Sequence, residues 1–504
     1  MESKNIGKVA IVGGGVAGWM SAAFLAHMLG KSVLVTVIDV QGIGSSAFQD
    51  SAIPPLKAFH AALGIQEADL LSKTQGSMKL GTQFVNWGKL GARYFHPHGA
   101  YGAEFDVVPL HQWLLKESTT QGDAPCLDDL TMAGVMAQDG RFAHPVPDRR
   151  MIQSTYDYAY HMDSSLYCDY LRRLAIGAGV VVYDATSVEV VADSATGQLT
   201  TLVLDGGVTV EADLFLDCSG HTRLLFSGPL QSTFEDWTHY LPCDRAVSVS
   251  TARANDFQPF TRVTAREAGG QWRIPLQHRT SSGYIYDSQL CSDENALGVL
   301  LDNLDGRMIG DPNVTAFTNG RLSASFIKNV VAIGDAAGFL EPLEATSLHQ
   351  IQSSLFRLLT LWPRRDCNPS IVDEFNNITA REWDLARDFL ILHYHATSRS
   401  DSQFWRYTKD MAIPDTLQHR LAHWNTSGRL VSPGPEVFQG PSWLSVLVGQ
   451  GMMPQNLDPL VDAREGQVDY HARLAGIRRI IAETSAQMPA HRDWIDKNCR
   501  GAKI

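Results

Sequence analysis

The sequence predicts a mixed α/β fold that opens with a strand–helix–strand unit and ends in a mainly helical region. The first observation is an apolar, β-branched run at residues 8–12, followed by a glycine-rich turn and a small, apolar helix pattern over 19–29. A second apolar run covers 33–38, which completes a βαβ unit. The second observation is a mostly helical pattern from residue 366 onward.

The length of 504 residues corresponds to roughly three domains or one large composite fold. We predict a first domain over 1–365, with substrate-side insertions near 70–150 and 240–320. A mainly helical C-terminal substrate-site module is predicted over 366–504. Within the first domain, Asp205-Gly206 stands between two short strand patterns and predicts a hairpin turn.

The composition excludes several classes of protein. The 42 Lys and Arg residues are outnumbered by 54 Asp and Glu residues, which gives a net charge of −12, whereas a nucleic-acid-binding protein usually carries a basic excess. Seven cysteines without a CxxC pair indicate reduced thiols, and no cluster has the spacing of metal ligands. With no signal peptide and no run of about 18 apolar residues, we expect a soluble cytoplasmic protein without a membrane partner.

The glycine-rich turn predicts a dinucleotide-binding site, because it has the GxGxxG spacing between a strand and a helix. In such a turn the first glycine forms the tight bend, the second admits a pyrophosphate, and the third lets the helix pack on the strand. Asp39 follows Gly18 by 21 residues and ends the second strand, where an acid accepts ribose hydroxyls. The turn residues expected to bind the dinucleotide are Gly13, Gly15, Val16, Ala17 and Gly18.

A later segment indicates that the dinucleotide is FAD. Residues 334–342, Gly-Asp-Ala-Ala-Gly-Phe-Leu-Glu-Pro, resemble the second FAD fingerprint of flavoprotein monooxygenases. This resemblance implies that Asp335 contacts the ribityl chain, that Leu340 is a further cofactor contact, and that the following helix points its N-terminus at the flavin. Residues 217–220, Asp-Cys-Ser-Gly, resemble the small-residue turn beside the adenine half of FAD.

Several short segments, in order and spacing, resemble the flavin-dependent halogenases of the tryptophan halogenase type over nearly the whole chain. The matching segments are 13–19, 84–87, 158–163, 240–246 and 404–406. The resemblance implies an enzyme that uses FADH2, O2 and chloride or bromide to halogenate an aromatic small molecule. The sequence has no second GxGxxG motif for NAD(P)H, which fits reduction of the flavin by a separate NAD(P)H-dependent reductase.

Two residues match the catalytic pair of this family, namely Lys79 in Ser-Met-Lys-Leu-Gly-Thr and Glu344 in Glu-Pro-Leu-Glu-Ala-Thr-Ser. The resemblance implies that the lysine holds hypohalous acid or carries halogen as a haloamine. The glutamate then orients the oxidant, stabilises the cationic ring or accepts the ring proton. The resemblance also implies halide binding at the amides of Thr346 and Ser347. Outside this frame, Lys79 would be a solvated surface lysine and Glu344 a helix N-terminal acid.

Three segments depart from the family pattern. The WxWxIP signature reads Gly-Gln-Trp-Arg-Ile-Pro over 270–275, so Gly270 replaces the first Trp, and Trp272 is either part of that signature or a core aromatic residue. The loop at 45–52 differs in composition from the family loop that closes over the flavin. Ala345 stands where the family has Ser or Thr.

The substrate end of the chain departs most. Residues 442–449 resemble a segment in which free-tryptophan enzymes carry a Tyr-Tyr pair, but Leu444 has no hydroxyl to hold an amino-acid zwitterion. We therefore favour an indole or similar electron-rich aromatic, including one that is part of a larger molecule, over free tryptophan. The candidate substrate residues, each with packing as its alternative role, are His96, His98, Tyr101, Phe105 and Trp443.

Two alternative functions are kept. A flavin-dependent aromatic hydroxylase would share the cofactor, but direct hydroxyl transfer needs no relay lysine. A catalytically silent FAD-binding homologue would account for the altered loop at 45–52. The oligomeric state is open, with a homodimer as a common arrangement for soluble enzymes.

Overall fold

The computed structural model describes residues 5–43, 48–121, 125–226, 230, 232–253 and 256–502. The chain divides into two compact units, each assembled from three separate segments. Unit 1 comprises Met1–Gly76, Met162–His239 and Phe317–Asp384, and unit 2 comprises Ser77–His161, Tyr240–Ala316 and Leu385–Ile504. The predicted mixed α/β class is confirmed. The first two segments of unit 2 overlap the stretches predicted as insertions, while the predicted domain boundary at residue 365 stays a prediction.

The core of unit 1 is a six-stranded, mainly parallel sheet with the order β19-β20-β11-β1-β2-β7. The strands are β1 (Lys8–Val12), β2 (Leu34–Val40), β7 (Val181–Ala185), β11 (Leu214–Asp217), β19 (Phe326–Ile327) and β20 (Val330–Ala332). Helix α1 (Val16–Leu29) joins β1 to β2, which confirms the predicted βαβ unit. The apolar runs of β1 and β20 are buried, as is usual for a parallel sheet that is covered on both faces. The core of unit 1 therefore lies around these two strands.

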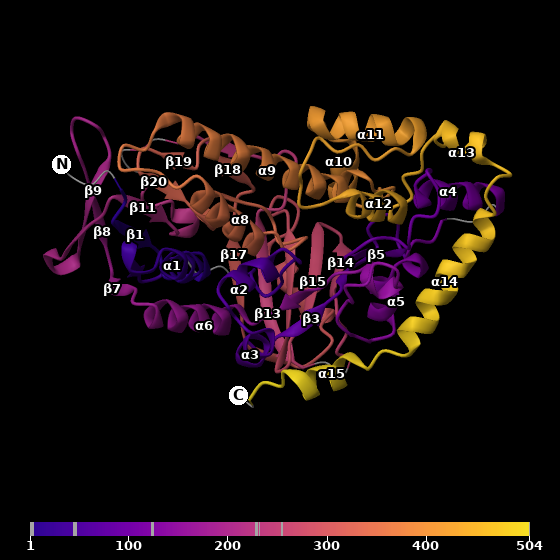
Figure 1. Ribbon diagram of the computed structural model, residues 1–504, viewed down its shortest axis with the longest axis horizontal. Helices are drawn as coiled ribbons and strands as arrows, with labels where there is room; N and C mark the ends of the chain where they lie inside the picture. Colours follow the sequence, from indigo (N-terminus) through magenta and orange to yellow (C-terminus); the bar gives the residue numbers. More distant parts are fainter. Residues whose placement is uncertain are drawn as a thin grey trace. The chain divides into compact units, whose positions relative to one another are not determined.

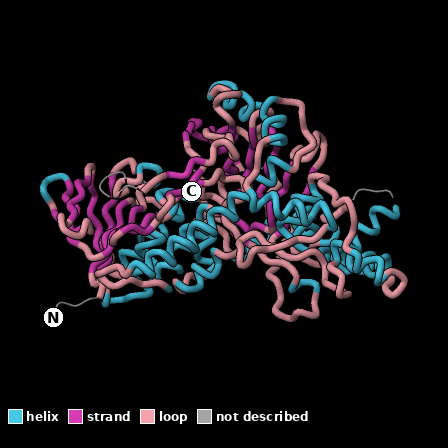
Figure 2. The backbone as a smooth tube through the Cα atoms, turned by 90° about the horizontal axis from the view of Figure 1, so that it is seen from above, coloured by secondary structure: helices cyan, strands magenta, loops and turns pink. Residues whose placement is uncertain are grey.

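Helices and two small sheets complete unit 1. Helix α1 lies beside α6, which Figure 1 shows, and it also contacts α8. Figure 2 shows strands of this unit as adjacent magenta segments near the N-terminal end, with cyan helices alongside. The helices are α2 (Leu56–Ala62), α3 (Glu67–Lys73), α6 (Ser164–Gly177) and α8 (Ser347–Thr360), and α9 (Pro369–His395) crosses the boundary at Asp384.

The two small sheets of unit 1 are three-stranded and have the orders β10-β9-β8 and β12-β18-β21. β9 and β10 pair antiparallel on either side of Asp205-Gly206, which confirms the predicted hairpin. The strands are β8 (Val188–Ala192), β9 (Leu199–Leu204), β10 (Thr209–Glu211), β12 (Phe234–Asp236), β18 (Gly320–Leu322) and β21 (Gly338–Phe339).

Unit 2 is built on a seven-stranded sheet with the order β17-β13-β16-β15-β14-β4-β5. Its strands are β4 (Gly81–Val85), β5 (Arg93–Pro97), β13 (Arg245–Ala252), β14 (Thr261–Arg266), β15 (Gly269–Pro275), β16 (Arg279–Tyr286) and β17 (Met308–Ala316). A separate two-stranded sheet joins β3 (Ser77–Lys79) to β6 (Ala159–His161). The sheet therefore brings together stretches of sequence that lie more than 150 residues apart, such as β4 and β14.

Helices account for most of the C-terminal third, as the sequence pattern predicts. They are α10 (Gln403–Asp410), α11 (Asp415–Ser427), α12 (Gly440–Gly449), α13 (Pro459–Arg464), α14 (Tyr470–Ala486) and α15 (His491–Asn498). Unit 2 has three further helices that come between its strands in the sequence. They are α4 (Leu110–Gln121), α5 (Met132–Gln138) and α7 (Asp293–Asp302). Among the helices in the described ranges, none is both long and apolar enough to cross a bilayer.

Candidate active site

The predicted FAD motifs of unit 1 meet at the carboxyl ends of neighbouring strands. β20, β11 and β1 are adjacent and parallel, and each is followed by one of the three motifs. Gly13 has a φ of +118°, and a Cβ atom on it would lie 2.3 Å from the carbonyl oxygen of Cys218. A Cβ atom on Gly334 would lie 3.0 Å from the Cβ of Ala17. Open parallel sheets bind their ligands at this edge, so the fold joins the motifs that the sequence predicts for FAD.

The glycine turn has room for backbone only. A Cβ atom on Gly18 would lie 1.8 Å from the carbonyl oxygen of Gly13, so any larger residue would push α1 away from the strand. A Cβ atom on Gly14 would lie 1.9 Å from Oδ1 of Asp39. The carboxyl group of Asp39 therefore lies directly against the turn, as a ribose-binding acid of this motif should.

A cavity of about 360 Å³ lies beside this turn. Its lining includes Gly14, Gly15, Val16 and Asp39. Burial raises the pKa of Asp39, and the positive charge of Arg172 opposes that shift. A cavity of this size with a carboxyl group at its wall and a helix N-terminus at its base fits the adenosine and phosphate part of FAD.

The second fingerprint forms a 3₁₀ turn over Gly334–Ala336. Asp335 lies in this turn, and its negative charge acts on His221, whose pKa is nevertheless lowered by burial. The ring of His221 is 4.8 Å from that of Phe339, and the next residue, Leu340, is buried. Asp335 and Phe339, which precedes Leu340, therefore lie beside the turn that follows β11.

The loop at 45–52 is described only from Phe48 onward, and Ser45, Ser46 and Ala47 lie outside the described residues. The ring of Phe48 is 6.0 Å from the rings of both Phe317 and Phe339. Phe339 precedes Leu340, so the described end of the altered loop packs on the second FAD fingerprint.

Glu344 lies three residues before α8 and is 1% exposed. Ala345 has a φ of +57°, an uncommon backbone conformation for a residue with a side chain. Thr346 is the N-cap residue, yet its side chain makes no capping hydrogen bond. The side chain of Thr346 therefore leaves the N–H groups of the first turn of α8, which begins at Ser347, to other partners, and such groups suit a small anion.

A buried polar network fastens α8 to α9. His349 Nε2 lies 3.0 Å from Glu382 Oε1, Ser353 Oγ donates to Glu382 Oε2 at 2.8 Å, and Arg357 pairs with the same carboxylate. Arg357 also donates to Oγ1 of Thr379 at 2.8 Å. Burial tends to raise the pKa of Glu382, but hydrogen bonds and the charges of His349 and Arg357 lower it to about 2. This network fixes the helix that begins at the predicted halide-binding residues.

Lys79 is the last residue of β3 in unit 2 and is 1% exposed. It stands opposite Ala159 in the pairing of β3 with β6. A lysine is rarely buried without a polar partner or a function, so its burial contradicts the alternative of a solvated surface lysine. Burial, followed by the charge of Lys79, holds the pKa of His161 well below its usual range, so His161 is neutral.

Neighbouring side chains hold the strand that carries Lys79. Ser77 Oγ donates to the carbonyl oxygen of Pro275 at 2.7 Å and lies 3.1 Å from His161 Nδ1. His161 Nε2 lies 2.9 Å from Thr261 Oγ1. Because the Ser77 proton is used on Pro275, His161 donates through Nδ1 and accepts through Nε2, which is the neutral form of the ring.

A histidine of the last helix also supports this strand. His491 Nε2 accepts a hydrogen bond from the backbone N–H of Met78 at 3.2 Å, and Nδ1 lies 3.0 Å from the carbonyl oxygen of Phe257. Burial lowers the pKa of His491 to about 4. The sequence separation of 413 residues between His491 and Met78 gave no local signal from which this contact could be predicted.

The altered signature lies in β15 and is packed around two glycines. A Cβ atom on Gly270 would lie 3.1 Å from Cζ2 of Trp87, so the ring of Trp87 occupies the space where a side chain at 270 would begin. Trp272 is buried, and its ring lies over Gly283 of β16, where a Cβ atom would approach it to 2.1 Å. The structure therefore favours the interpretation of Trp272 as a core aromatic residue.

Two of the candidate substrate residues meet in an aromatic cluster of unit 2. The ring of His96 lies 5.6 Å from Phe389 and 6.1 Å from Phe438, and Phe389 lies 5.3 Å from Trp443. Trp443 Nε1 donates to the carbonyl oxygen of Phe438 at 3.0 Å, and the guanidinium of Arg420 covers its ring at 4.1 Å. Sequence reasoning missed Phe389 and Phe438, because an aromatic residue in a helix or loop looks the same whether it binds a ligand or packs.

The other candidates are more dispersed. The ring of His98 lies 6.4 Å from that of His96. Tyr101 is buried beside Asp128 and Ser445, and its burial raises its pKa well above the usual range. Phe105 is partly buried.

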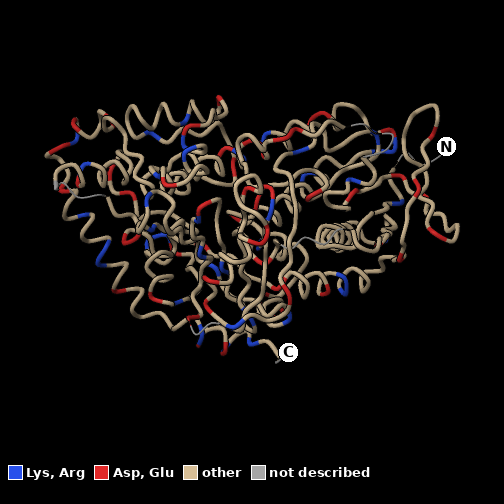
Figure 3. Tube along the Cα trace, turned by 180° about the vertical axis from the view of Figure 1, so that it is seen from behind, with Lys and Arg blue, Asp and Glu red and all other residues tan. Residues whose placement is uncertain are grey.

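The charged side chains and the potential metal ligands of the described residues are spread through the structure. Figure 3 shows basic and acidic residues interspersed along the chain. Within the ranges that the structure covers, no group of three His, Cys, Asp or Glu side chains could hold a metal ion.

Comparisons with known proteins identify the family of this chain. The family model described as tryptophan halogenase matches residues 8–466. Tryptophan 6-halogenase SttH of Streptomyces toxytricini is 30% identical, over 94% of this chain and 95% of that protein. The structure of Xcc4156, a flavin-dependent halogenase from Xanthomonas campestris, is 38% identical, covers 99% of this chain and 100% of its own, and has a TM-score of 0.94.

A second solved structure is similar to the same degree. BrvH, a flavin-dependent halogenase from Brevundimonas sp. BAL3, is 38% identical, covers 98% of this chain and 99% of its own, and gives a TM-score of 0.92. These matches extend over both units, and the predicted cofactor FAD, with halide as co-substrate, follows from the family. The chain belongs to the tryptophan halogenase family and is a flavin-dependent, FADH2-using halogenase.

Proposed function

We propose that the protein halogenates an electron-rich aromatic substrate of the indole type, with Lys79 and Glu344 as the catalytic pair. The observation that carries the proposal is the burial of a lysine at the family's lysine position, within a strand held by Ser77, His161 and His491. A lysine is buried where it has a polar partner or a function, and the family chemistry gives this amine a reactive oxidant to hold. When bound, reduced FAD together with O2 and halide supplies hypohalous acid.

The surroundings of Lys79 support a delivery role. The strand that carries it is hydrogen-bonded through Ser77 and Met78, which fixes the backbone from which the Lys79 side chain extends. His161 is held neutral and does not compete with Lys79 for a proton. A fixed amine can hydrogen-bond the oxidant or accept its halogen and pass it to a ring carbon.

Glu344, Thr346 and Ser347 complete the proposed chemistry at the start of α8. A carboxylate can stabilise a cationic ring and accept the proton that leaves it. The N–H groups of the first helical turn can hold chloride or bromide. The anchoring of α8 through Glu382 supports a fixed geometry for this turn. Gly13, Gly15, Val16, Ala17, Gly18, Asp39, Asp335 and Leu340 are the proposed FAD contacts.

The proposed substrate-binding residues support an aromatic substrate that carries no zwitterionic amino-acid group. The cluster of His96, Phe389, Phe438 and Trp443 offers aromatic surface, and Leu444 is buried and has no hydroxyl. Relatives of this chain are named for tryptophan, but an apolar residue beside the cluster weakens recognition of an amino-acid group. Indole, alone or within a larger molecule, is therefore the proposed substrate, with His98, Tyr101 and Phe105 as further contacts.

The decisive experiment supplies FAD, a separate flavin reductase, NADH, and equal chloride and bromide, with indole, tryptophan or a phenol as substrate. We expect a halogenated indole by mass spectrometry, and its loss in Lys79→Met, which keeps the length of the side chain. Lys497→Ala, an exposed lysine on α15, serves as the control and should not change the yield. A hydroxylated product that survives Lys79→Met would favour the hydroxylase, and failure to bind reduced FAD would favour the silent homologue.

The proposal also concerns compartment and assembly. A reductase that supplies reduced FAD must share the compartment of the halogenase, and the proposed compartment for both is the cytoplasm. Size-exclusion chromatography with light scattering would decide between a monomer and the homodimer.

A further inference from the structure

Helix α8 carries a buried side-chain amide that makes no hydrogen bond. Gln350 is 2% exposed, and neither its Nε2 nor its Oε1 has a partner among the residues that the structure covers. A buried polar atom without a partner costs free energy, and native structures rarely keep one without a reason. Because both atoms of this amide are in that position, Gln350 is a candidate for contact with a ligand.

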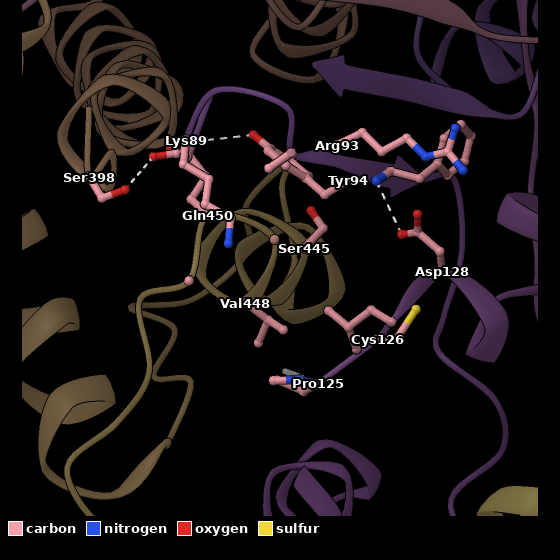
Figure 4. Close-up of a pocket in the computed structure, with 16 residues that line it drawn as sticks. Lys89, Arg93, Tyr94, Pro125, Cys126, Asp128, Ser398, Ser445, Val448 and Gln450 are labelled. Carbon is pink, nitrogen blue, oxygen red and sulfur yellow. Dashed lines mark hydrogen bonds between the residues drawn. The ribbon is translucent and has the colours of Figure 1, made fainter. Parts of the chain in front are cut away.

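Other buried glutamines use their amides within the protein. Gln352, two residues further along α8, donates from Nε2 to the carbonyl oxygen of Pro55 at 2.9 Å. Gln450, on the wall of the unit 2 cavity that Figure 4 shows, donates from Nε2 to the hydroxyl of Tyr94 at 3.2 Å. Each of these amides joins its own segment to a neighbouring one. Gln350 contributes no such hydrogen bond to the described part of the chain.

Gln350 lies one turn after the start of α8. Its backbone N–H donates to the carbonyl oxygen of Thr346 at 2.9 Å, which closes the first turn. A helical side chain leans toward the helix N-terminus and covers the preceding turn, so the amide lies along the turn of Thr346 and Ser347. The next residue, Ile351, faces the second FAD fingerprint, because a Cβ atom on Gly334 would lie 3.1 Å from its Cγ1. The amide therefore belongs to the part of unit 1 where α8 meets that fingerprint.

The chemistry of the amide selects the kind of ligand. Nε2 needs an acceptor, Oε1 needs a donor, and the two atoms are bonded to the same carbon. A halide ion offers no donor, and its negative charge would repel Oε1. The pyrimidine edge of the flavin ring carries N3–H between two carbonyl groups, so it presents a donor and an acceptor side by side. These groups are present in both oxidised and reduced FAD.

We propose that the side-chain amide of Gln350 binds the pyrimidine edge of the flavin. Its Nε2 donates to a flavin carbonyl oxygen, and its Oε1 accepts from N3–H. Gln350 is thereby a further cofactor contact, which neither fingerprint includes. The inference rests on the proposed placement of FAD at the two fingerprints and does not depend on Lys79 or Glu344.

The test compares oxidised FAD with 3-methyl-FAD, which lacks the N3–H donor, by fluorescence titration of the full chain. Gln350→Met keeps the length of the side chain and removes both polar atoms. The parent should bind 3-methyl-FAD about tenfold more weakly than FAD, and Gln350→Met should bind FAD about tenfold more weakly than the parent does. In Gln350→Met the two Kd values should agree within about threefold, because the amide that distinguishes the flavins is gone. The matched control Gln352→Met should keep the preference of the parent.

Thermal unfolding without FAD separates contact with the cofactor from a structural role. Gln350→Met should unfold at the temperature of the parent or above it, because no hydrogen bond within the described chain is lost. Gln352→Met loses the hydrogen bond to Pro55 and should unfold at a lower temperature. A Gln350→Met variant that unfolds well below the parent would show a structural role for the amide and overturn the proposal.

The titrations can overturn the proposal in other ways. Equal Kd values of the parent for FAD and 3-methyl-FAD, or a parent-like preference in Gln350→Met, would contradict it. An altered halide dependence of product formation, with unchanged FAD affinity, would assign the amide to the halide instead.

Gly18→Ala tests the placement of FAD itself. If that variant binds FAD normally, the placement and the inference both fail. If it binds FAD weakly while the parent does not distinguish the two flavins, only the inference fails. Halogenation through Lys79 is decided separately by the product assay.

Discussion

Restoring the tryptophan of the family signature at position 270 should destabilise this protein. A Cβ atom at 270 already approaches Cζ2 of Trp87 to 3.1 Å, and Trp87 is 1% exposed. The ring of Trp87 cannot withdraw easily, because its Nε1 donates to the carbonyl oxygen of Val263 at 3.2 Å and its ring lies 5.5 Å from that of Trp405. An indole at 270 would have to occupy the space that the indole of Trp87 fills.

The expected cost follows from packing. Overfilling a core by a few methylene groups costs about 1–3 kcal/mol, and an indole is larger, so Gly270→Trp should cost about 3 kcal/mol or more. Gly270→Ala adds one methyl group at a tight but adjustable distance and gains a little from the reduced freedom of the unfolded chain, so it should stay within about 1 kcal/mol of the parent. Comparing Gly270→Trp with Gly270→Ala separates the effect of the volume of the indole from the effect of losing the glycine.

The assay is urea unfolding followed by far-UV circular dichroism at fixed FAD concentration, because bound cofactor shifts the midpoint. Trp87→Gly alone should cost about 3–5 kcal/mol. Trp87→Gly combined with Gly270→Trp should be more stable than the sum of the two single changes by about 1–3 kcal/mol, since one indole replaces the other. A Gly270→Trp variant that unfolds at the parent midpoint would refute the argument that Trp87 fills this space.

Three further predictions concern the cofactor turn and two buried titratable groups. Gly18→Ala should weaken FAD binding at least about tenfold in a fluorescence titration, because its Cβ would lie 1.8 Å from the carbonyl oxygen of Gly13; Gly177→Ala, with open space around it, should bind FAD normally. Glu382→Gln should cost about 3 kcal/mol in urea unfolding, since a buried ion pair loses one charge. The Glu382 pKa of about 2 lies below its ordinary 4.5. The stabilisation that Glu382 gives the folded state should therefore be present above pH 4.5 and disappear as the pH falls toward 2. A difference in unfolding free energy between parent and variant that does not change with pH would contradict this. His491 has a pKa of about 4 against an ordinary 6.5. The stabilisation that neutral His491 gives the folded state should therefore be present above pH 6.5 and decline as the pH falls toward 4. In His491→Phe the unfolding free energy should change less with pH between 6.5 and 4 than it does in the parent.

The proposed cofactor site could be formulated from sequence alone because its signals are local. Gly13, Gly18 and Asp39 occupy fixed places in one strand–helix–strand unit, and the backbone geometry of that unit dictates their spacing. The short segment around Asp335 is equally self-contained. The fold class followed from the same signals, and the structure confirmed it.

The surroundings of Lys79 were beyond prediction for the opposite reason. Ser77, Thr261 and His491 come from distant parts of the chain, and each is an ordinary polar residue in its own segment. Only the pairing of strands and the docking of the last helix turn them into the support of one buried lysine.

Residue type and local spacing were enough to predict the family chemistry, the dinucleotide turn and the proposed catalytic pair. The tertiary structure decided that Lys79 is buried and that Trp87 fills the space beside Gly270. It also decided that Phe389 and Phe438 join His96. These facts depend on packing between residues far apart in the chain, because burial and side-chain contact are properties of the folded whole and leave no periodic trace in a single segment.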